Sequence, residues 1–166
     1  MSEQNERMVT VGMPAPDFTL KSSPDSEFLS LESLRGRPVV LAFYPADWSP
    51  TCGDQLSLYN EVLSEFEALG AQLLGISVDN CWSHIAYAKS KNLGFPLLAD
   101  FHPKGAISMA YESWDSENGF SERNLFVIDG DGIVRWIHRS PRRVNPGASG
   151  ILNALEALTR GEEPQP

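Results

Sequence analysis

Cys52, one of two cysteines in the 166-residue chain, occupies a position that favours reactivity. An apolar run at 39–44, typical of a buried strand, precedes it, and a helical pattern begins directly after a short break. Ser49 is a preferred N-cap and Pro50 suits the first helical position, so Cys52 is expected in the first turn. The free N–H groups and the dipole of a helix start stabilise a thiolate, the reactive form of cysteine. By residue type and position alone, a small buried apolar cysteine is an equally good interpretation.

The residues that lead into Cys52 form a motif. Pro45, Ser49 and Cys52 fit the pattern Pro-x-x-x-Thr/Ser-x-x-Cys, and Arg123 enters a later apolar run at 124–129. On these residues the chain resembles the peroxiredoxins, and within them the bacterial alkyl hydroperoxide reductase/thiol-specific antioxidant group. The resemblance covers nearly the whole chain. It implies a thiol-dependent peroxidase that reduces hydrogen peroxide and small organic hydroperoxides in antioxidant defence.

The resemblance also implies a role for each motif residue. Cys52 is expected to attack the peroxide O–O bond as a thiolate and to become a sulfenic acid. Arg123 is expected to stabilise the thiolate and the charge on the leaving oxygen; the alternative is an exposed arginine at a strand end. Ser49 is expected to hydrogen-bond the thiolate or the peroxide, or to serve only as the helix cap. Pro45 is expected to shield the sulfur, or simply to end the strand.

Cys81 raises a separate question. It follows a second apolar run at 72–78, so both cysteines are expected at the carboxyl ends of neighbouring parallel strands. The resemblance implies that Cys81 can resolve the Cys52 sulfenic acid as a disulfide, once the first turn of one or both helices unwinds. The alternative is an inert Cys81 and an external thiol. His84 gives a Cys-x-x-His spacing with Cys81, but two ligands do not make a metal site, so we expect no metal and place His84 on the helix surface or at the rim of the pocket.

The composition and charge of the chain limit its possible binding partners and its cellular compartment. The 22 acidic and 13 basic side chains give a net charge of −9, which argues against nucleic-acid binding. No apolar run approaches the roughly 20 residues of a membrane helix, and the N-terminus lacks a signal-peptide pattern. Two cysteines without an export signal favour the cytoplasm. The chain has no glycine-rich nucleotide loop, so we expect no cofactor. We expect the electrons to come from a thioredoxin-like protein or a low-molecular-weight thiol.

The remaining pattern predicts the fold. We expect one domain over 11–160, a flexible N-terminal tail over 1–10 and a flexible C-terminal tail over 161–166. Within the domain we expect a short hairpin, alternating strands and helices, a second hairpin and a final helix. The hairpins are expected over 14–34 and 125–137, and the other strands over 39–44, 72–78 and 95–99. The helices are expected over 51–69, 82–91, 103–111 and 151–158. This order alone predicts an α/β protein with a mixed sheet. The resemblance implies the thioredoxin-like fold, a central mixed β-sheet flanked by helices with an N-terminal β-hairpin extension.

Two other functions remain open from the sequence. A thioredoxin-like thiol–disulfide oxidoreductase is disfavoured because residues 52–55, Cys-Gly-Asp-Gln, lack the second cysteine of Cys-x-x-Cys. A chaperone-like binding module without peroxidase turnover would not need the intact motif. The resemblance also implies a homodimer, for which Trp48, Trp82 and Trp114 are candidates for an aromatic contact.

Overall fold

The computed structural model describes residues 8–166. In this part of the chain the strands are β1 (Thr19–Ser22), β2 (Phe28–Ser30), β3 (Val39–Phe43), β4 (Gln72–Ser77), β5 (Leu97–Ala99), β6 (Trp114–Asp115), β7 (Phe120–Ser121), β8 (Arg123–Ile128) and β9 (Val134–Ser140). The helices are a 3-10 turn η1 (Glu32–Leu34) and the α-helices α1 (Pro50–Glu61), α2 (Leu63–Ala68), α3 (Cys81–Lys91), α4 (Ala106–Ala110) and α5 (Ser149–Thr159).

A mixed sheet organises these elements. Seven of the strands in residues 8–166 form it, in the order β2-β1-β5-β4-β3-β8-β9, while β6 and β7 pair separately. β3, β4 and β5 are parallel, and β8 runs antiparallel beside β3. The hairpin β1–β2 joins the other edge through an antiparallel pairing of β1 with β5. The predicted central mixed sheet and the N-terminal hairpin are therefore both present.

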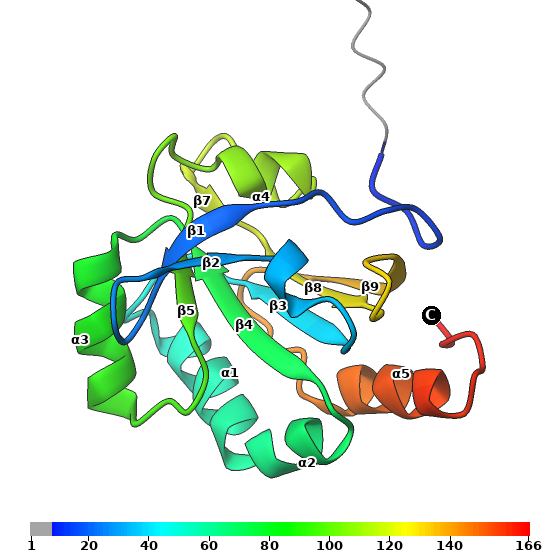
Figure 1. Cartoon of the computed structure of the whole chain (residues 1–166). Coiled ribbons are helices and arrows are strands. Elements are labelled where there is room, and N and C mark those ends of the chain that lie inside the picture. The colour runs from blue at the N-terminus through cyan, green and yellow to red at the C-terminus, as the bar shows by residue number, and fades with distance from the viewer. Residues whose placement is uncertain (1–7) are drawn as a thin grey trace, which may run out of the picture.

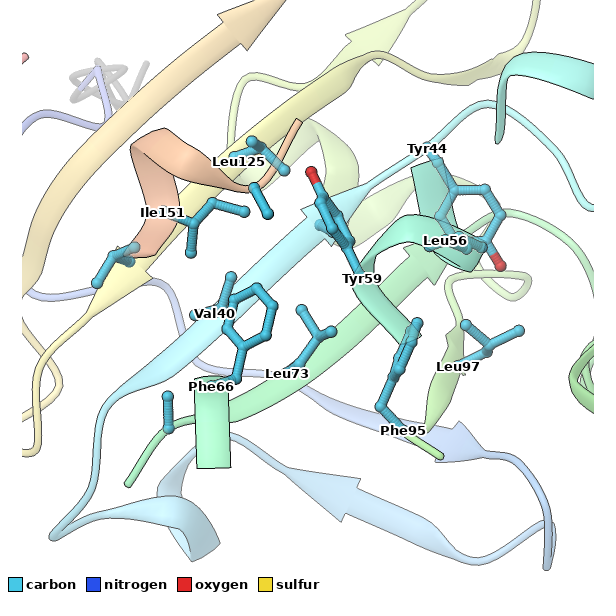
Figure 2. Packing of buried hydrophobic residues seen from close by; sticks show 14 of the residues in the cluster. Val40, Tyr44, Leu56, Tyr59, Phe66, Leu73, Phe95, Leu97, Leu125 and Ile151 are labelled. Atoms are coloured by element: carbon cyan, nitrogen blue, oxygen red, sulfur yellow. The ribbon is translucent and has the colours of Figure 1, made fainter. Parts of the chain in front are cut away.

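Helices and loops cover the sheet on both faces (Figure 1). Apolar residues of α1, α2, α3 and α5 pack on one face, together with Val40 and Leu73 from the central strands (Figure 2). The N-terminal segment and α4 pack on the other face, around Leu41 and Tyr111. Every side chain of β3 is buried because both of its faces are covered, which explains why this strand reads as a continuous apolar run.

Two predicted helices differ in the structure, and one hairpin was not predicted. The helix predicted over 51–69 is interrupted at Val62, whose backbone (φ −104°, ψ 16°) leaves the helical range and separates α1 from α2. The helix predicted from residue 103 begins only at Ala106, after Gly105 in a left-handed conformation (φ 75°). The hairpin β6–β7 was not predicted, since strands of two residues carry too little periodicity to be recognised.

The structure describes the predicted C-terminal tail and the last three residues of the predicted N-terminal tail. Residues 1–7 of the predicted N-terminal tail lie outside the described residues. Within the rest, Val9 is buried and its N–H donates to Glu112 Oε2 at 2.8 Å, so the chain is already packed two residues before the predicted domain boundary at 11. Residues 161–166 are mostly exposed, although Glu163 lies 3.6 Å from Arg135 in an exposed ion pair.

Candidate active site

The first turn of α1 presents Cys52 as the sequence predicts. Ser49 is the N-cap, with an extended backbone (φ −70°, ψ 142°), and its Oγ accepts a hydrogen bond from the Cys52 N–H at 3.2 Å. Pro50 occupies the first helical position, so Cys52 is the third residue of the helix. The helix start that can stabilise a thiolate is therefore present, and Cys52 Sγ lies next to it.

Arg123 brings a permanent positive charge to the sulfur. It is the first residue of β8, and its Nη1 and Nη2 both lie 3.4 Å from Cys52 Sγ. Arg123 is 1% exposed and Cys52 0%, so the alternative of an exposed arginine at a strand end is wrong. Removed from water, a forked cation at this distance attracts a thiolate far more strongly than at the surface.

Two further residues, Gln55 and Tyr59, hold the guanidinium in place. Gln55 Oε1 accepts from Arg123 Nη1 at 2.7 Å, and Gln55 Nε2 donates to the Tyr59 hydroxyl at 3.1 Å. The Tyr59 hydroxyl in turn donates to the carbonyl of Gly147, and burial raises its pKa to about 12, so it remains a donor at neutral pH. Neither residue was predicted as part of the site. They could have been found from their spacing of three and seven residues from Cys52, which places them on the same face of the helix as Cys52.

The arginine is also fixed from the other side. Its Nε donates to the main-chain carbonyl of Arg142 at 2.9 Å, so the loop after β9 orients the plane of the guanidinium. Pro45, the first residue of the motif, is buried in the loop between β3 and α1. The structure thus brings together Ser49, Cys52 and Arg123, and places Pro45 four residues before the N-cap in the same loop.

Cys81 lies in a different environment. It is the first residue of α3, and its Sγ lies 3.7 Å from the carbonyl oxygen of Ser22 and 3.5 Å from Ser26 Oγ. Both cysteines are free. Three strands separate β1, which carries Ser22, from β8, which carries the arginine at Cys52, and neighbouring strands are about 4.8 Å apart. The partners of the two sulfurs therefore lie on strands that are well separated across the sheet in the folded state.

His84 is not at the helix surface, and this prediction was wrong. It is 0% exposed, with Nδ1 2.9 Å from Asp47 Oδ2 and Nε2 3.0 Å from the carbonyl oxygen of Leu98. The reason is that the loop before α1 and strand β5 both cover this side of α3. One ligand atom each from Asp47, Asp79 and His84 lie within 4.8 Å of one another. These groups already bond within the cluster, since Asp79 Oδ2 accepts from the Asp47 N–H, so we assign no metal to it.

Comparison with known proteins identifies the family. A model of the AhpC/TSA family matches residues 11–137. The chain belongs to this family, the peroxiredoxins. It is 37% identical over 154 residues to alkyl hydroperoxide reductase E of Mycobacterium tuberculosis, covering 92% of this chain and 99% of that one. It is 33% identical over 154 residues to peroxiredoxin 2 of Thermoplasma acidophilum, covering 89% of this chain and 75% of the relative.

Solved structures of peroxiredoxins share the fold. The reduced 2-Cys peroxiredoxin of Plasmodium vivax superposes with a TM-score of 0.83 at 27% identity, over 90% of this chain and 82% of that one. AhpC of Mycobacterium tuberculosis, at 22% identity, matches with a TM-score of 0.82 and supports the fold alone. The thioredoxin-like fold expected from the sequence is confirmed.

Membership of the peroxiredoxins decides between the functions that the sequence left open. The protein is a thiol-dependent peroxidase, an antioxidant oxidoreductase that acts on peroxides. The thioredoxin-like oxidoreductase and the chaperone-like module are not favoured. None of the helices within residues 8–166 has the length and apolar character needed to cross a bilayer.

Proposed function

We propose that Cys52 is the peroxidatic cysteine of this peroxidase and that Arg123, Ser49 and Pro45 complete its catalytic site. The observation that carries the proposal is the buried fork of Arg123, whose two terminal nitrogens both lie 3.4 Å from Cys52 Sγ. Two donors aimed at one sulfur also supply two positions from which to bind the oxygens of a peroxide.

The reaction then proceeds in one displacement. The Cys52 thiolate attacks one oxygen of a hydroperoxide, so that an S–O bond forms and the O–O bond breaks. The leaving oxygen departs with the electron pair of the O–O bond and takes up a proton, which gives water or an alcohol. Cys52 is oxidised to the sulfenic acid. The charge of Arg123 favours this step because it stabilises negative charge first on sulfur and then on the leaving oxygen.

Ser49 can cap the helix and contact the substrate at the same time. Its Oγ uses a lone pair to accept from the Cys52 N–H, which leaves its own proton free to donate. We propose that this proton goes to the bound peroxide. Pro45 has no N–H to hydrate and is buried, which supports the proposed role in shielding the sulfur from water.

We propose that an external thiol, on a thioredoxin-like protein or a low-molecular-weight compound, reduces the sulfenic acid in the folded enzyme. The separation of the partners of Cys52 and Cys81 by three strands supports this route. Cys81 remains the proposed resolving cysteine of the alternative route, which requires the first turns of α1 and α3 to unwind, because a disulfide needs Cα atoms within about 7 Å.

Two aspects of the protein's setting, its oligomeric state and its compartment, are also proposed. We propose a homodimer, supported by the exposed side chains of Trp48 and Trp82, which are 57% and 76% exposed; Trp114 is half-buried and contributes less. Sedimentation as a monomer at micromolar concentration would contradict it. We propose the cytoplasm as the compartment, supported by two cysteines that are both free.

The proposed function is tested by oxidising the fully reduced protein with one equivalent of hydrogen peroxide and mapping its peptides by mass. We expect one oxygen added at Cys52, and no peroxide consumption by a Cys52→Ser variant. Loss of two hydrogens linking Cys52 to Cys81 would support the same peroxidatic role but replace the external route with the internal one. An unmodified Cys52 would overturn the proposal.

A further inference from the structure

A buried network anchors the loop that leads from β3 into α1. The carboxylate of Asp47 in this loop is fully buried. Its Oδ1 accepts from the Tyr44 hydroxyl at 2.7 Å and its Oδ2 from Ser83 Oγ at 2.9 Å, while its own N–H donates to Asp79 Oδ2 at 2.8 Å. Asp47 is therefore held by both its backbone and its side chain.

His84, in the second turn of α3, completes this network. Its Nε2 faces the carbonyl oxygen of Leu98 at 3.0 Å, and since a carbonyl only accepts, Nε2 carries a proton. Its Nδ1 lies 2.9 and 3.1 Å from the two carboxylate oxygens of Asp47, so a second proton lies between the ring and the carboxylate. Both ring nitrogens are thus engaged, and the histidine connects the loop to β5 through α3.

The next residue of the loop is also held by α3. Trp48 has a left-handed backbone (φ 71°), an unfavourable conformation for a bulky residue that persists only where its surroundings enforce it. Its ring packs edge-on against that of Tyr87, with centroids 4.9 Å apart. Asp47 and Trp48 directly precede Ser49, the N-cap that accepts from Cys52 N–H. The position of the reactive turn therefore depends on α3, although none of the hydrogen bonds of His84 involves Cys52.

We propose that His84 is a positioning residue of the peroxidase. Through Asp47 it fixes the loop so that Ser49 begins α1 where Cys52 Sγ meets both terminal nitrogens of Arg123. This inference rests on the proposed role of Cys52. Its physical basis is that transition-state stabilisation depends on groups already in place, so that a shift of about 1 Å costs roughly a hundredfold in rate.

The test compares two reactions of the same sulfur in a His84→Leu variant. We expect the rate constant for sulfenic acid formation by hydrogen peroxide to fall by about ten- to a hundredfold. Alkylation of Cys52 by iodoacetamide is measured at about pH 10, where a thiol ionises without help from an arginine. A loosened loop exposes a sulfur that is buried in the native protein, so we expect alkylation at this pH to be faster than in wild type. A merely structural histidine would not move the two reactions in opposite directions.

Asp100→Asn is the matched control. Asp100 is a buried carboxylate that accepts from the N–H and the hydroxyl of Ser108, both at 2.8 Å, and from the N–H of Ile107, away from the reactive loop. We expect this variant to lower the melting temperature as His84→Leu does, while leaving the peroxide rate within about twofold of wild type.

His84→Gln keeps an N–H for the carbonyl of Leu98 but loses the donor to the Asp47 carboxylate, so we expect it to recover only part of the peroxide rate. It also carries the test if His84→Leu does not fold. Wild-type peroxide rates in the folded His84 variants, or equal losses in both reactions, would overturn the inference. Failure of the proposed function would look different, since Cys52 of the wild-type protein itself would then stay unmodified by peroxide.

Discussion

Cys52 and Cys81 occupy corresponding places in the fold but different chemical surroundings. Each is buried in the first turn of a helix that follows one of two adjacent parallel strands, β3 or β4. Cys52 Sγ faces two nitrogens of a cation, whereas Cys81 Sγ faces the carbonyl oxygen of Ser22. A carbonyl oxygen accepts a hydrogen bond from a thiol and repels a thiolate. Because both cysteines have a helix start, the cation is the feature by which we expect Cys52 to differ in reactivity.

Strand direction explains why only one of the two sites receives the arginine. β8 runs antiparallel to β3, so its first residue, Arg123, lies at the carboxyl end of β3, where α1 begins. The outer neighbour of β4 is β5, which runs parallel to it and therefore begins at the opposite edge of the sheet. The order and direction of the strands, more than the helix starts, separate the two cysteines chemically.

Replacing Arg123 is expected to have the largest effect on this difference. In Arg123→Met the rate constant for peroxide reduction should fall by about 10² to 10³, the cost of losing a preorganised donor at developing charge. Arg123→Lys keeps the charge but loses the fork, so an intermediate rate is expected. Stopped-flow oxidation by hydrogen peroxide measures both. Arg139→Met is the control, because Arg139 is a partly exposed arginine of β9 paired with Glu112 at 3.7 Å. A folded Arg123→Met with wild-type kinetics would show that the guanidinium is not what distinguishes the cysteines.

Competitive alkylation tests the comparison without a mutation. Cys81 is 8% exposed and Cys52 0%, so accessibility alone favours modification of Cys81. Thiolate stabilisation favours Cys52, and we expect it to react more than tenfold faster with limiting iodoacetamide at pH 7. Peptide mapping by mass gives the ratio, and unfolded protein provides the reference. Preferential labelling of Cys81 would mean that burial outweighs the charge of Arg123.

Gln55→Leu is expected to act through the arginine. It removes the acceptor that holds Arg123 Nη1 at 2.7 Å, and we expect a loss of about tenfold in the peroxide rate as the fork loses its alignment. Gln72→Leu is a matched control, because Gln72 Oε1 also accepts from an arginine, Arg37 Nη2, at 2.7 Å but at the exposed far end of the sheet. Equal rates in the two variants would show that Arg123 needs no such support.

The part of the site that could be predicted from the sequence is its local part. The start of α1 depends on interactions across three residues, from the cap Ser49 through Pro50 to Cys52. A short stretch of sequence is therefore enough to recognise it. Arg123 is 71 residues from Cys52, and no local rule connects them, so its place required the resemblance to a family.

Residues whose role depends on distant elements were missed or misplaced. Gln55 has the helical spacing of a core position, but its role in orienting the guanidinium depends on an arginine from β8. His84 was predicted at the helix surface or at the rim of the pocket because α3 was considered without the loop and the strand β5 that cover it. Whether a helix face is buried depends on the elements that pack against it, and the periodicity within the helix does not reveal those elements.

Ser49→Ala separates the cap from the proposed contact with peroxide. Loss of the cap should reduce the free energy of unfolding by about 1 kcal/mol, measured by chemical denaturation. The peroxide rate should fall several-fold, less than in Arg123→Met, because both nitrogens of the arginine remain at the sulfur. Ser49→Thr keeps the hydroxyl and should restore both quantities. An unchanged rate together with lost stability would leave Ser49 as a helix cap only.

Cys81→Ser should have the smallest effect on the first oxidation. The serine hydroxyl can still donate to the Ser22 carbonyl, and Cys52 keeps its contact with Arg123, so the rate of sulfenic acid formation should stay within about twofold of wild type. The lifetime of the sulfenic acid, followed by trapping with dimedone in the absence of added thiol, is the more informative quantity. If it is the same in wild type and variant, Cys81 does not reach Cys52, and the two sites remain chemically separate during turnover. A lifetime that shortens only when Cys81 is present would mean that the helix starts unwind after oxidation, and the contrast between the two cysteines would then belong to the reduced state alone.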